Sequence, residues 1–328
     1  MNNSLPAGGD RLELMQTFVR IVEAGSLSAA AAQLGTTQPT VSRRLQALER
    51  SLGLRLLQRS THVMKLTSDG ERCFAHAREL MASWEAMQSE LRGATDEPRG
   101  MLRVVAPHAL GQDQLMAPLA DYLRRYPGVS IDWVLHDRRP DFIAEGVDCA
   151  IHVGTVDDPS VVALPLAEVP RIVVAAPQLL QGRPVPDGDL APEALAALPW
   201  VALRAFYHRE VTLGRSTGTQ QKGDDEERSF AIAPRLVTDS LYALRNAVLA
   251  GLGVGIASTW MLQDDLAQGR LVHLAPQWQA APLPVYLVYP HARFYPARLR
   301  LFMDLMRERT PAITGVAAPG SARGLRSR

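Results

Sequence analysis

The sequence predicts an α+β protein of several domains: a small helical unit at the amino terminus, one long connecting helix, and a larger α/β domain. Its 328 residues exceed the length of one ordinary domain. Apolar residues recur at helical spacing over the first hundred residues, whereas strand-like and helix-like segments alternate from Met101 onward. Residues 11–66 carry eight basic and three acidic groups, and residues 67–98 carry three basic and seven acidic groups. This order fits a nucleic-acid-binding head on a solvated connector, although charge alone fits an ordinary surface equally well.

Composition excludes several other classes of protein. Apolar residues make up 47% of the chain and charged residues 21%, which predicts well-packed cores, and the net charge of +1 excludes a polybasic or polyacidic protein. No export signal precedes Asp10 and no apolar run reaches about 18 residues, so we expect a cytoplasmic protein without a membrane span. Cys73 and Cys149 lack the spacing of a disulfide framework or a metal site, and each is most simply a small buried side chain.

The first two helices are expected to be short and to end at glycines. Apolar residues between Leu12 and Val22 predict a first helix that ends before Gly25. Either Ser26 or Ser28 is expected to cap a second, alanine-rich helix over residues 29–34.

A third helix opens at Thr37-Gln38-Pro39, where a proline in the first turn costs no hydrogen bond. Its apolar stripe would be Val41, Leu45, Leu48 and Leu52, and at about 100° per residue the opposite face is polar and basic. Such a helix after two short ones indicates a helix-turn-helix, whose outer groups suit base edges and phosphates in a major groove. A merely solvated face would explain each polar residue alone but not the whole arrangement. The residues expected to contact DNA here are Ser26, Thr37, Gln38, Pro39, Thr40, Ser42, Arg43, Arg44, Gln46 and Arg50.

A two-stranded hairpin is predicted next, because apolar residues flank Ser60-Thr61-His62 on both sides. Its basic side chains are typical of a wing that reaches backbone phosphates or the minor groove. We expect Arg59 and His62 to contact DNA.

Residues 18–70 resemble the DNA-binding region of the LysR-type transcriptional regulators. The resemblance rests on the alanine-rich second helix and on Gln38-Pro39, Ser42-Arg43, Leu48-Glu49, Leu52-Gly53, Leu56, Arg59, Leu66-Thr67 and Gly70, in the family's order and spacing. The chain departs from the family at Leu57, where phenylalanine is frequent, and at His62, where arginine is frequent. The resemblance implies a winged helix-turn-helix transcriptional regulator, not an enzyme, that binds a double-stranded DNA operator with dyad symmetry. It also implies a homodimer that pairs into a homotetramer, and RNA polymerase as a further partner.

The long helix is predicted over residues 68–92, between a DNA-binding domain at 11–67 and a hinge at 93–100. Ser68 and Glu71 have the spacing of a capping box. Apolar residues then follow at the spacing of a coiled-coil seam, interrupted by Gln88, and they would either pair two chains or pack on the protein's own core. Pairing is the preferred interpretation, and the expected dimerisation residues are Phe74, Ala77, Met81, Trp84 and Leu91.

The rest of the chain is expected to be an α/β domain over residues 101–311 with parallel sheets, followed by a disordered tail at 312–328. The polar segment 214–229 is interpreted as a mobile loop or an insertion. The glycine-rich segment 251–255 is interpreted as the exit of a helix into a strand, which is the reverse of the strand-to-helix order in a dinucleotide-binding site. Residues 126–154 and 237–258 resemble the LysR effector-binding domain. The resemblance implies two lobes similar to type 2 periplasmic binding proteins, with lobe 1 at about 101–170 and 272–311 and lobe 2 at about 171–271.

Ligands of open α/β domains lie beyond the carboxyl ends of strands, near helix amino termini. These positions are Pro107, His108 and Ala109 in lobe 1 and Leu203, Arg204, Thr238 and Ser240 in lobe 2, with His152 at the end of a neighbouring strand. Alternatives stay open, since His108 and Ser240 can serve only as caps, Arg204 can point to solvent, and His152 stands where related sequences often carry arginine. We expect a small-molecule effector, an organic acid, and no cofactor or metal.

Two other functions fit parts of the pattern. The α/β lobes alone would fit a solute-binding protein or a non-catalytic sensor without a DNA role, but the winged head and the missing export signal argue against both. An enzyme would need a reactive constellation, and the sequence offers no serine–histidine–aspartate set and no histidine or cysteine spacing for a metal.

Overall fold

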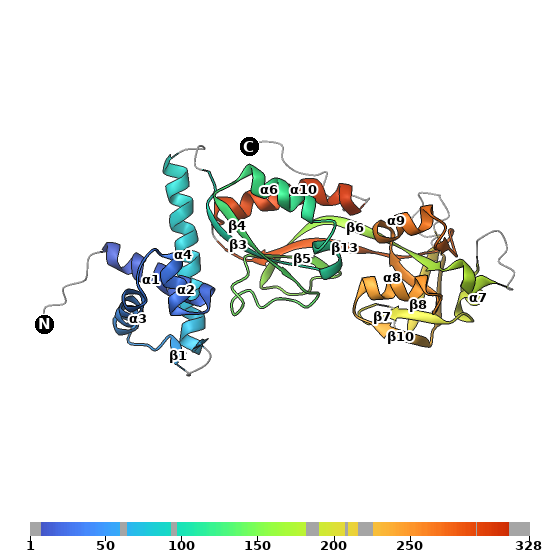
Figure 1. The fold of residues 1–328 in the computed structure, drawn as a ribbon, viewed down its shortest axis with the longest axis horizontal. Coiled ribbons are helices and arrows are strands. Elements are labelled where there is room, and N and C mark those ends of the chain that lie inside the picture. Colours follow the sequence, from blue (N-terminus) through green and yellow to red (C-terminus); the bar gives the residue numbers. More distant parts are fainter. Residues whose placement is uncertain are drawn as a thin grey trace, which may run out of the picture.

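The computed structural model describes residues 8–59, 64–92, 97–181, 190–206, 209–215, 226–292 and 294–314. Figure 1 shows three bodies in a row: a helical head, a first lobe and a second lobe, with one long helix standing between the head and lobe 1. No helix in these ranges is long and apolar enough to cross a membrane.

The head contains α1 (Gly8–Ala24), α2 (Leu27–Gln33), α3 (Gln38–Leu52), and a hairpin of β1 (Leu57–Arg59) and β2 (Met64–Leu66). Ser26, not Ser28, caps α2, because its Oγ accepts a hydrogen bond from the amide of Ala29 at 3.1 Å. The apolar stripe of α3 packs into the head core up to Leu48, whereas Leu52 is exposed, so the buried stripe is one turn shorter than the spacing predicts.

The long helix α4 runs from Ser68 to Arg92, but its cap differs from the predicted capping box. Thr67, rather than Ser68, holds the first turn: its Oγ1 accepts from the amide of Gly70 at 2.9 Å, and its carbonyl accepts from the amide of Glu71 at 2.9 Å. A Cβ at position 70 would lie 2.0 Å from the carbonyl oxygen of Leu56, so only glycine permits this close approach of the wing to α4.

Lobe 1 is built on three parallel strands, β3 (Gly100–Ala106), β4 (Val129–Leu135) and β5 (Cys149–Val153), with β3 in the middle. Its helices are the short α5 (His108–Gly111), α6 (Met116–Arg125) and α10 (Ala297–Thr314). The aromatic rings of Tyr122 and Phe302 meet edge to face at 5.6 Å and join α6 to α10. The helix continues to Thr314, so the first residues of the predicted tail are helical; residues 315–328 lie outside the described ranges.

Two long strands carry the chain between the lobes, and the prediction of parallel sheets is wrong for them. The strands β6 (Val161–Ala175) and β13 (Gln279–Pro290) run antiparallel to each other in a sheet that has nine strands within the described ranges and whose main path is β11-β6-β13-β5-β3-β4. Residues Leu274, Trp278 and Ala280 pack in the core of lobe 2, so the chain returns to lobe 1 near residue 281 rather than 272.

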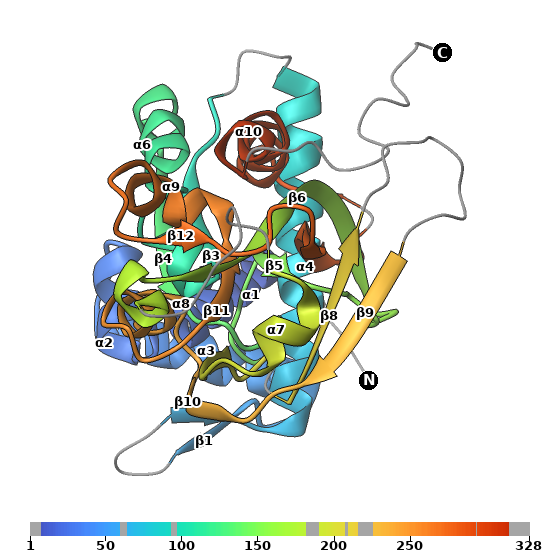
Figure 2. The same cartoon turned by 90° about the vertical axis from the view of Figure 1, so that its right-hand side faces the viewer.

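Lobe 2 contains the parallel pair β7 (Trp200–Leu203) and β10 (Pro234–Thr238), together with β11 (Gly255–Ser258) and β12 (Val272–His273), which pair with β6. Its helices are α7 (Pro192–Ala196), α8 (Leu241–Leu249), α9 (Thr259–Ala267) and a 3-10 turn at Pro177–Leu180. The predicted loop at 214–229 is wrong at both ends, because β8 (Glu210–Arg215) and β9 (Glu226–Ala231) form an antiparallel hairpin, seen side by side in Figure 2. Residues 216–225 lie outside the described ranges.

Candidate nucleic-acid interface and ligand cavity

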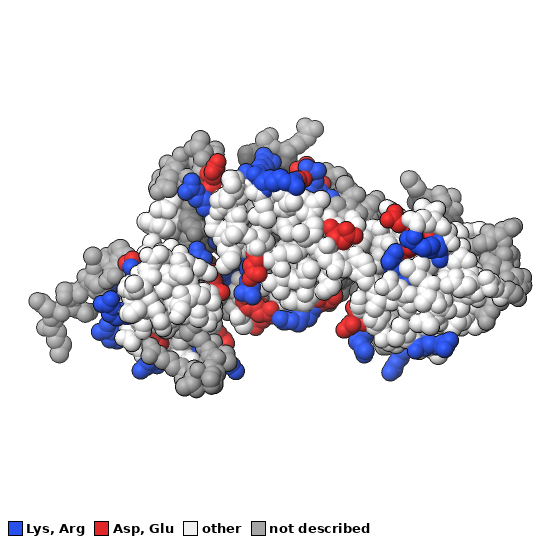
Figure 3. Space-filling view, in the orientation of Figure 1, with Lys and Arg blue, Asp and Glu red and all other residues white. Residues whose placement is uncertain are grey.

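The outer face of α3 presents the side chains that the sequence predicted for DNA contact. Gln38, Pro39, Arg43, Gln46 and Arg50 are exposed along it. Ser26 and Thr37, which directly precede α2 and α3, are also exposed, whereas Thr40, Ser42 and Arg44 are half-buried. Figure 3 shows Lys and Arg side chains at the outer edge of the head, on the side away from lobe 1. The basic face of the head is therefore open to a large partner.

Two adjacent arginines of α3 have different surroundings. Arg44 pairs with Glu13 of α1, which ties α3 to the first helix. Among the described residues, the guanidinium of Arg43 contacts only the hydroxyl of Thr40, at 3.4 Å, and this hydroxyl lies 2.9 Å from that of Thr37. Arg43 is thus free to donate to a base edge, while Arg44 first supports the fold of the head.

Glu49 supports the fold of the head, a role that was not predicted from the sequence. It is buried on α3, and its Oε1 accepts from the amide of Leu56 at 2.9 Å. A buried carboxylate with a backbone partner holds the start of the wing against the recognition helix. The signal was available, because an acidic residue directly follows Leu48 in a stripe that is otherwise apolar.

The wing is described only in part. Arg59 ends β1 and Lys65 is exposed on β2, but His62 and the side chain of Arg59 lie outside the described residues. Their expected contacts with DNA stay predictions.

The predicted dimerisation seam of α4 needs correction. Phe74 and Ala77 are 1% and 3% exposed in the core of the head itself, where the Phe74 ring meets that of Phe18 at 6.4 Å, so neither is available to a second chain. Of the other predicted residues, Met81 is half-buried, Trp84 is 42% exposed, and the side chain of Leu91 lies outside the described residues. Leu80 and Met87, which the prediction omitted, are 45% and 41% exposed and flank Trp84 at four- and three-residue spacing.

A cavity of about 410 Å³ lies between the lobes, at the carboxyl ends of β3, β4, β5 and β7. The lining residues that the sequence predicted are Pro107, His108, Ala109, His152 and Leu203.

Three predicted positions do not line this cavity. Arg204 is exposed, Thr238 accepts from the amide of Ser240 at 3.1 Å, and Ser240 caps α8 by accepting from the amide of Ala243 at 3.2 Å. For Arg204 and Ser240 these are the alternatives named in the sequence analysis: an arginine exposed to solvent and a serine that only caps its helix. In lobe 1 the helix amino terminus is also less available than expected, because α5 has only four residues and the amide of His108 donates to Asp137 at 3.2 Å.

Two arginines that line the cavity were not predicted from the sequence. Arg139 donates to the carbonyl of Thr155 at 3.1 Å, and within the described residues no carboxylate forms an ion pair with it. Asp158 of the same cavity is nearby: hydrogen bonds from Ser160 lower the pKa of this carboxyl, and the charge of Arg139 contributes in smaller part. Arg171 is 6% exposed on β6, donates to the carbonyl of Ala281 at 2.9 Å, and lies 5.4 Å from the ring centre of Phe206. Each left a signal in the sequence: Arg139 belongs to the charged run directly after β4, and Arg171 interrupts an apolar run.

His152 adds a neutral polar group to the cavity. Burial lowers the pKa of its imidazole, while a hydrogen bond to the carbonyl of Thr155 acts in the opposite direction. In the neutral ring its Nε2 donates to that carbonyl at 3.2 Å, which leaves Nδ1 as an acceptor. Within the described residues no three His, Cys, Asp or Glu side chains converge as a metal site requires.

Comparison with known proteins agrees with both parts of this geometry. The family described as bacterial regulatory helix-turn-helix protein, lysR family, matches residues 12–71, and the LysR substrate binding domain matches residues 95–311. The HTH-type transcriptional regulator PtxR of Pseudomonas aeruginosa is 31% identical over 297 residues, which cover 90% of this chain and 92% of that protein. The HTH-type transcriptional activator TtdR of Escherichia coli is 28% identical, over 93% and 94%. The full-length structure of AphB, a virulence activator of Vibrio cholerae, aligns with a TM-score of 0.55 at 28% identity, over 90% and 98%.

Proposed function

This chain belongs to the LysR family of transcriptional regulators, and we propose that the outer face of α3 reads its operator while a small anion between the lobes regulates it. The family membership makes the chain a DNA-binding regulator with an effector-binding domain. The observation that carries the finer proposal is that one chain holds both an exposed polar face on α3 and a cavity between the lobes with arginines in its wall.

In the proposed complex the amino-terminal half of α3 lies in the major groove. Arg43 and Gln46 are exposed on this face and have the donor and acceptor groups that pair with base edges, while Thr37 and Gln38 stand at the helix start, where phosphates bind. The wing adds phosphate contacts through Arg59 and His62.

A second copy of the chain completes the proposed DNA-binding unit. Leu80, Trp84 and Met87 form an exposed apolar stripe on α4 with the spacing of a coiled-coil seam, which supports pairing of two linker helices. Pairing of dimers into a tetramer is supported by lobe edges that stay open: β4 and β10 are edge strands, and Leu236 and Val237 of β10 are exposed. RNA polymerase is proposed as a further partner only because the chain belongs to this family of transcriptional regulators.

The proposed effector is a small organic acid. Arg139 has no carboxylate partner among the described residues, and Arg171 is buried in the cavity wall, whereas Arg138 is neutralised by two hydrogen bonds to Glu145. A carboxylate would receive charge-assisted hydrogen bonds from such guanidinium groups, and the half-buried His152 would contribute a neutral donor or acceptor. The aromatic and aliphatic remainder of the wall would cover the hydrocarbon part of the ligand.

A thermal-shift comparison of acids with their amides tests the ligand class. The full chain is melted with acetate, succinate and benzoate and, in parallel, with acetamide, succinamide and benzamide. We expect at least one acid to raise Tm where its amide does not, and Arg139→Ala to abolish that shift. Arg204→Ala is the matched control, because this arginine is exposed beside the cavity without lining it, and it should keep the shift. Equal shifts from acid and amide would contradict the proposal.

A further inference from the structure

One segment of lobe 1 forms a wall of two cavities. The β4–β5 segment, residues 136–148, connects β4 to β5. Its first half lines the effector cavity. Its second half lines another cavity, of about 330 Å³, whose opposite wall is formed by Arg20 and Glu23 of α1 and Phe74 and Arg78 of α4. Phe142 lines both cavities. The segment therefore separates the proposed ligand site from the DNA-binding head by a single layer of residues.

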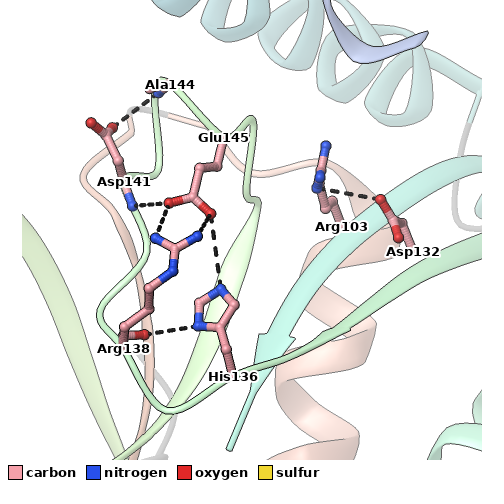
Figure 4. Close-up of polar contacts among 7 residues, drawn as sticks. All are labelled: Arg103, Asp132, His136, Arg138, Asp141, Ala144 and Glu145. Atoms are coloured by element: carbon pink, nitrogen blue, oxygen red, sulfur yellow. Dashed lines mark hydrogen bonds and ion pairs between the residues drawn. The ribbon is translucent and has the colours of Figure 1, made fainter. Parts of the chain in front are cut away.

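The β4–β5 segment is held together internally by Glu145 (Figure 4). The carboxylate of Glu145 accepts from both terminal nitrogens of Arg138, at 2.7 and 2.9 Å, and from the amide of Asp141 at 3.0 Å. Asp141 in turn accepts from the amides of Ile143 and Ala144 at 3.1 and 2.9 Å. The hydrogen bonds from Arg138 lower the pKa of Glu145, which keeps this carboxylate charged. A segment braced in this way moves as a unit rather than residue by residue.

At the ligand end, the segment is attached through a contact that an anion would replace. Arg139 donates to the carbonyl of Thr155, which also receives the hydrogen bond from His152. A carboxylate is a stronger acceptor for a guanidinium than a neutral carbonyl is. A bound acid would therefore draw Arg139 away from Thr155 and shift the segment that carries it.

At the head end, the segment is attached to the linker helix. Asp148 pairs with Arg78 of α4, and both side chains are largely buried, at 13% and 23% exposed. The other carboxylate oxygen of Asp148 accepts from the amide of Arg103 at 2.8 Å, which fixes the ion pair to β3. A Cβ placed on Gly146 would lie 3.6 Å from the ring of Phe74, so the backbone of the segment rests directly on this ring.

The residues on the head side belong to the core that supports the recognition helix. Phe74 packs edge to face against Phe18 and shares one hydrophobic cluster with Leu45 and Leu48 of α3. The guanidinium of Arg78 lies 5.7 Å from the centre of the Phe74 ring, so the ion pair and the aromatic contact reinforce each other.

We propose that the β4–β5 segment transmits occupancy of the effector cavity to the DNA-binding head of the same chain, through Asp148–Arg78 and Gly146–Phe74. This inference rests on the proposed function and adds a physical route to it. A ligand that moves the Arg139 end of the braced segment changes the position of Asp148, and thereby the angle at which α4 and the head stand on lobe 1. Because the contact lies within one chain, it acts in addition to any rearrangement between subunits.

A double-mutant cycle tests this route without knowledge of the natural effector. Ala109→Trp places a bulky side chain in the effector cavity as a permanent occupant, and Asp148→Asn removes the charge that binds Arg78 while keeping an acceptor for the amide of Arg103. The matched control is Asp132→Asn, since Asp132 pairs with Arg103 in the same lobe at 3.3 Å (Figure 4) but does not line the cavity beside the head. The affinity of each full-length protein for its own upstream DNA is measured by fluorescence anisotropy.

We expect Ala109→Trp to change the Kd for DNA by about fivefold or more, in line with ordinary coupling energies, in both the unmodified and the Asp132→Asn backgrounds. In the Asp148→Asn background the change should fall below about twofold. An equal change with and without Asp148, or no change in a folded Ala109→Trp protein, would overturn the proposal. If Ala109→Trp fails to fold by circular dichroism, Ala205→Trp, at an exposed lining position, replaces it. Failure of the proposed function would look different, because the unmodified protein would then lack specific DNA binding or any response to acids.

Discussion

Replacement of Arg43 by alanine is the sharpest perturbation of the proposed DNA contact. The side chain is exposed, and its guanidinium contacts only the Thr40 hydroxyl within the described residues, at 3.4 Å. Its removal should leave the free energy of unfolding unchanged within about 0.5 kcal/mol, as for other exposed positions. A stable head without this one base contact therefore isolates the recognition step.

The magnitude follows from what one arginine contributes at a base edge. A bidentate arginine–guanine pair contributes about 1–3 kcal/mol of discrimination, and a dimer that reads two half-sites makes this pair twice. The combined loss is about 2–6 kcal/mol, which weakens the specific Kd at least about thirtyfold. Binding to unrelated DNA should fall far less, because phosphate contacts carry most of it.

The assay is a fluorescence anisotropy titration on the upstream DNA of the gene and on a scrambled duplex, at one fixed salt concentration. Arg124→Ala is the control: it removes an exposed arginine of lobe 1 that pairs with Asp121 at 2.6 Å, should cost about 0–1 kcal/mol of stability, and should leave binding to both duplexes unchanged. Specific binding that survives Arg43→Ala unchanged would refute the assignment of the α3 face to the major groove.

The other predictions concern the wing, the linker helix and the cavity. Arg59→Ala should weaken all duplexes alike and lower the slope of log K against log salt by about 1, and a loss confined to the specific duplex would contradict a phosphate contact. Trp84→Asp should place a charge in the exposed stripe of α4 and halve the mass of the assembly in sedimentation velocity, because only the proposed contacts between lobes would remain, whereas an unchanged assembly would exclude this stripe as the seam. Burial lowers the pKa of His152 in the folded protein below its ordinary 6.5. As the pH drops through 6.5, the unfolded chain therefore binds a proton at this imidazole before the folded protein does, and the free energy of unfolding falls. His152→Gln should therefore lose less Tm than the unmodified chain between about pH 7.5 and about pH 5.5, and equal losses would show that His152 is not the titrating group.

The head was predictable because its signals are local. The 3.6-residue period of α3 separates buried Val41, Leu45 and Leu48 from exposed Arg43 and Gln46, and both sets were assigned correctly from spacing alone. Local chemistry was less decisive at the caps, since neighbouring hydroxyl residues compete for the same role. Ser26 rather than Ser28, and Thr67 rather than Ser68, were settled by the path of the backbone.

The seam of α4 shows where periodicity stops being informative. A stripe of apolar residues identifies the face of a helix that will be covered, but not what covers it. Phe74 and Ala77 are covered by the head of the same chain, and the exposed stripe begins at Leu80 on a neighbouring face of the helix. The decision between these alternatives depends on contacts with α1, more than fifty residues away in the sequence.

The cavity was predictable in position and only partly in its residues. The rule that ligands lie beyond the carboxyl ends of strands located Pro107, His152 and Leu203. It missed Arg171, because the place of this residue at the cavity depends on the antiparallel pairing of β6 with β13, which joins residues more than a hundred positions apart. It also missed Arg139, although the same rule applied to the end of β4 would have found it.

The most direct test of the central claim is a footprint of the full-length chain on its own upstream DNA, compared with the Arg43→Ala protein. The account predicts two protected half-sites related by a dyad, with centres an integral number of helical turns apart, and loss of both in Arg43→Ala at the same protein concentration. Protection without dyad symmetry, or half-sites that persist in Arg43→Ala, would contradict it.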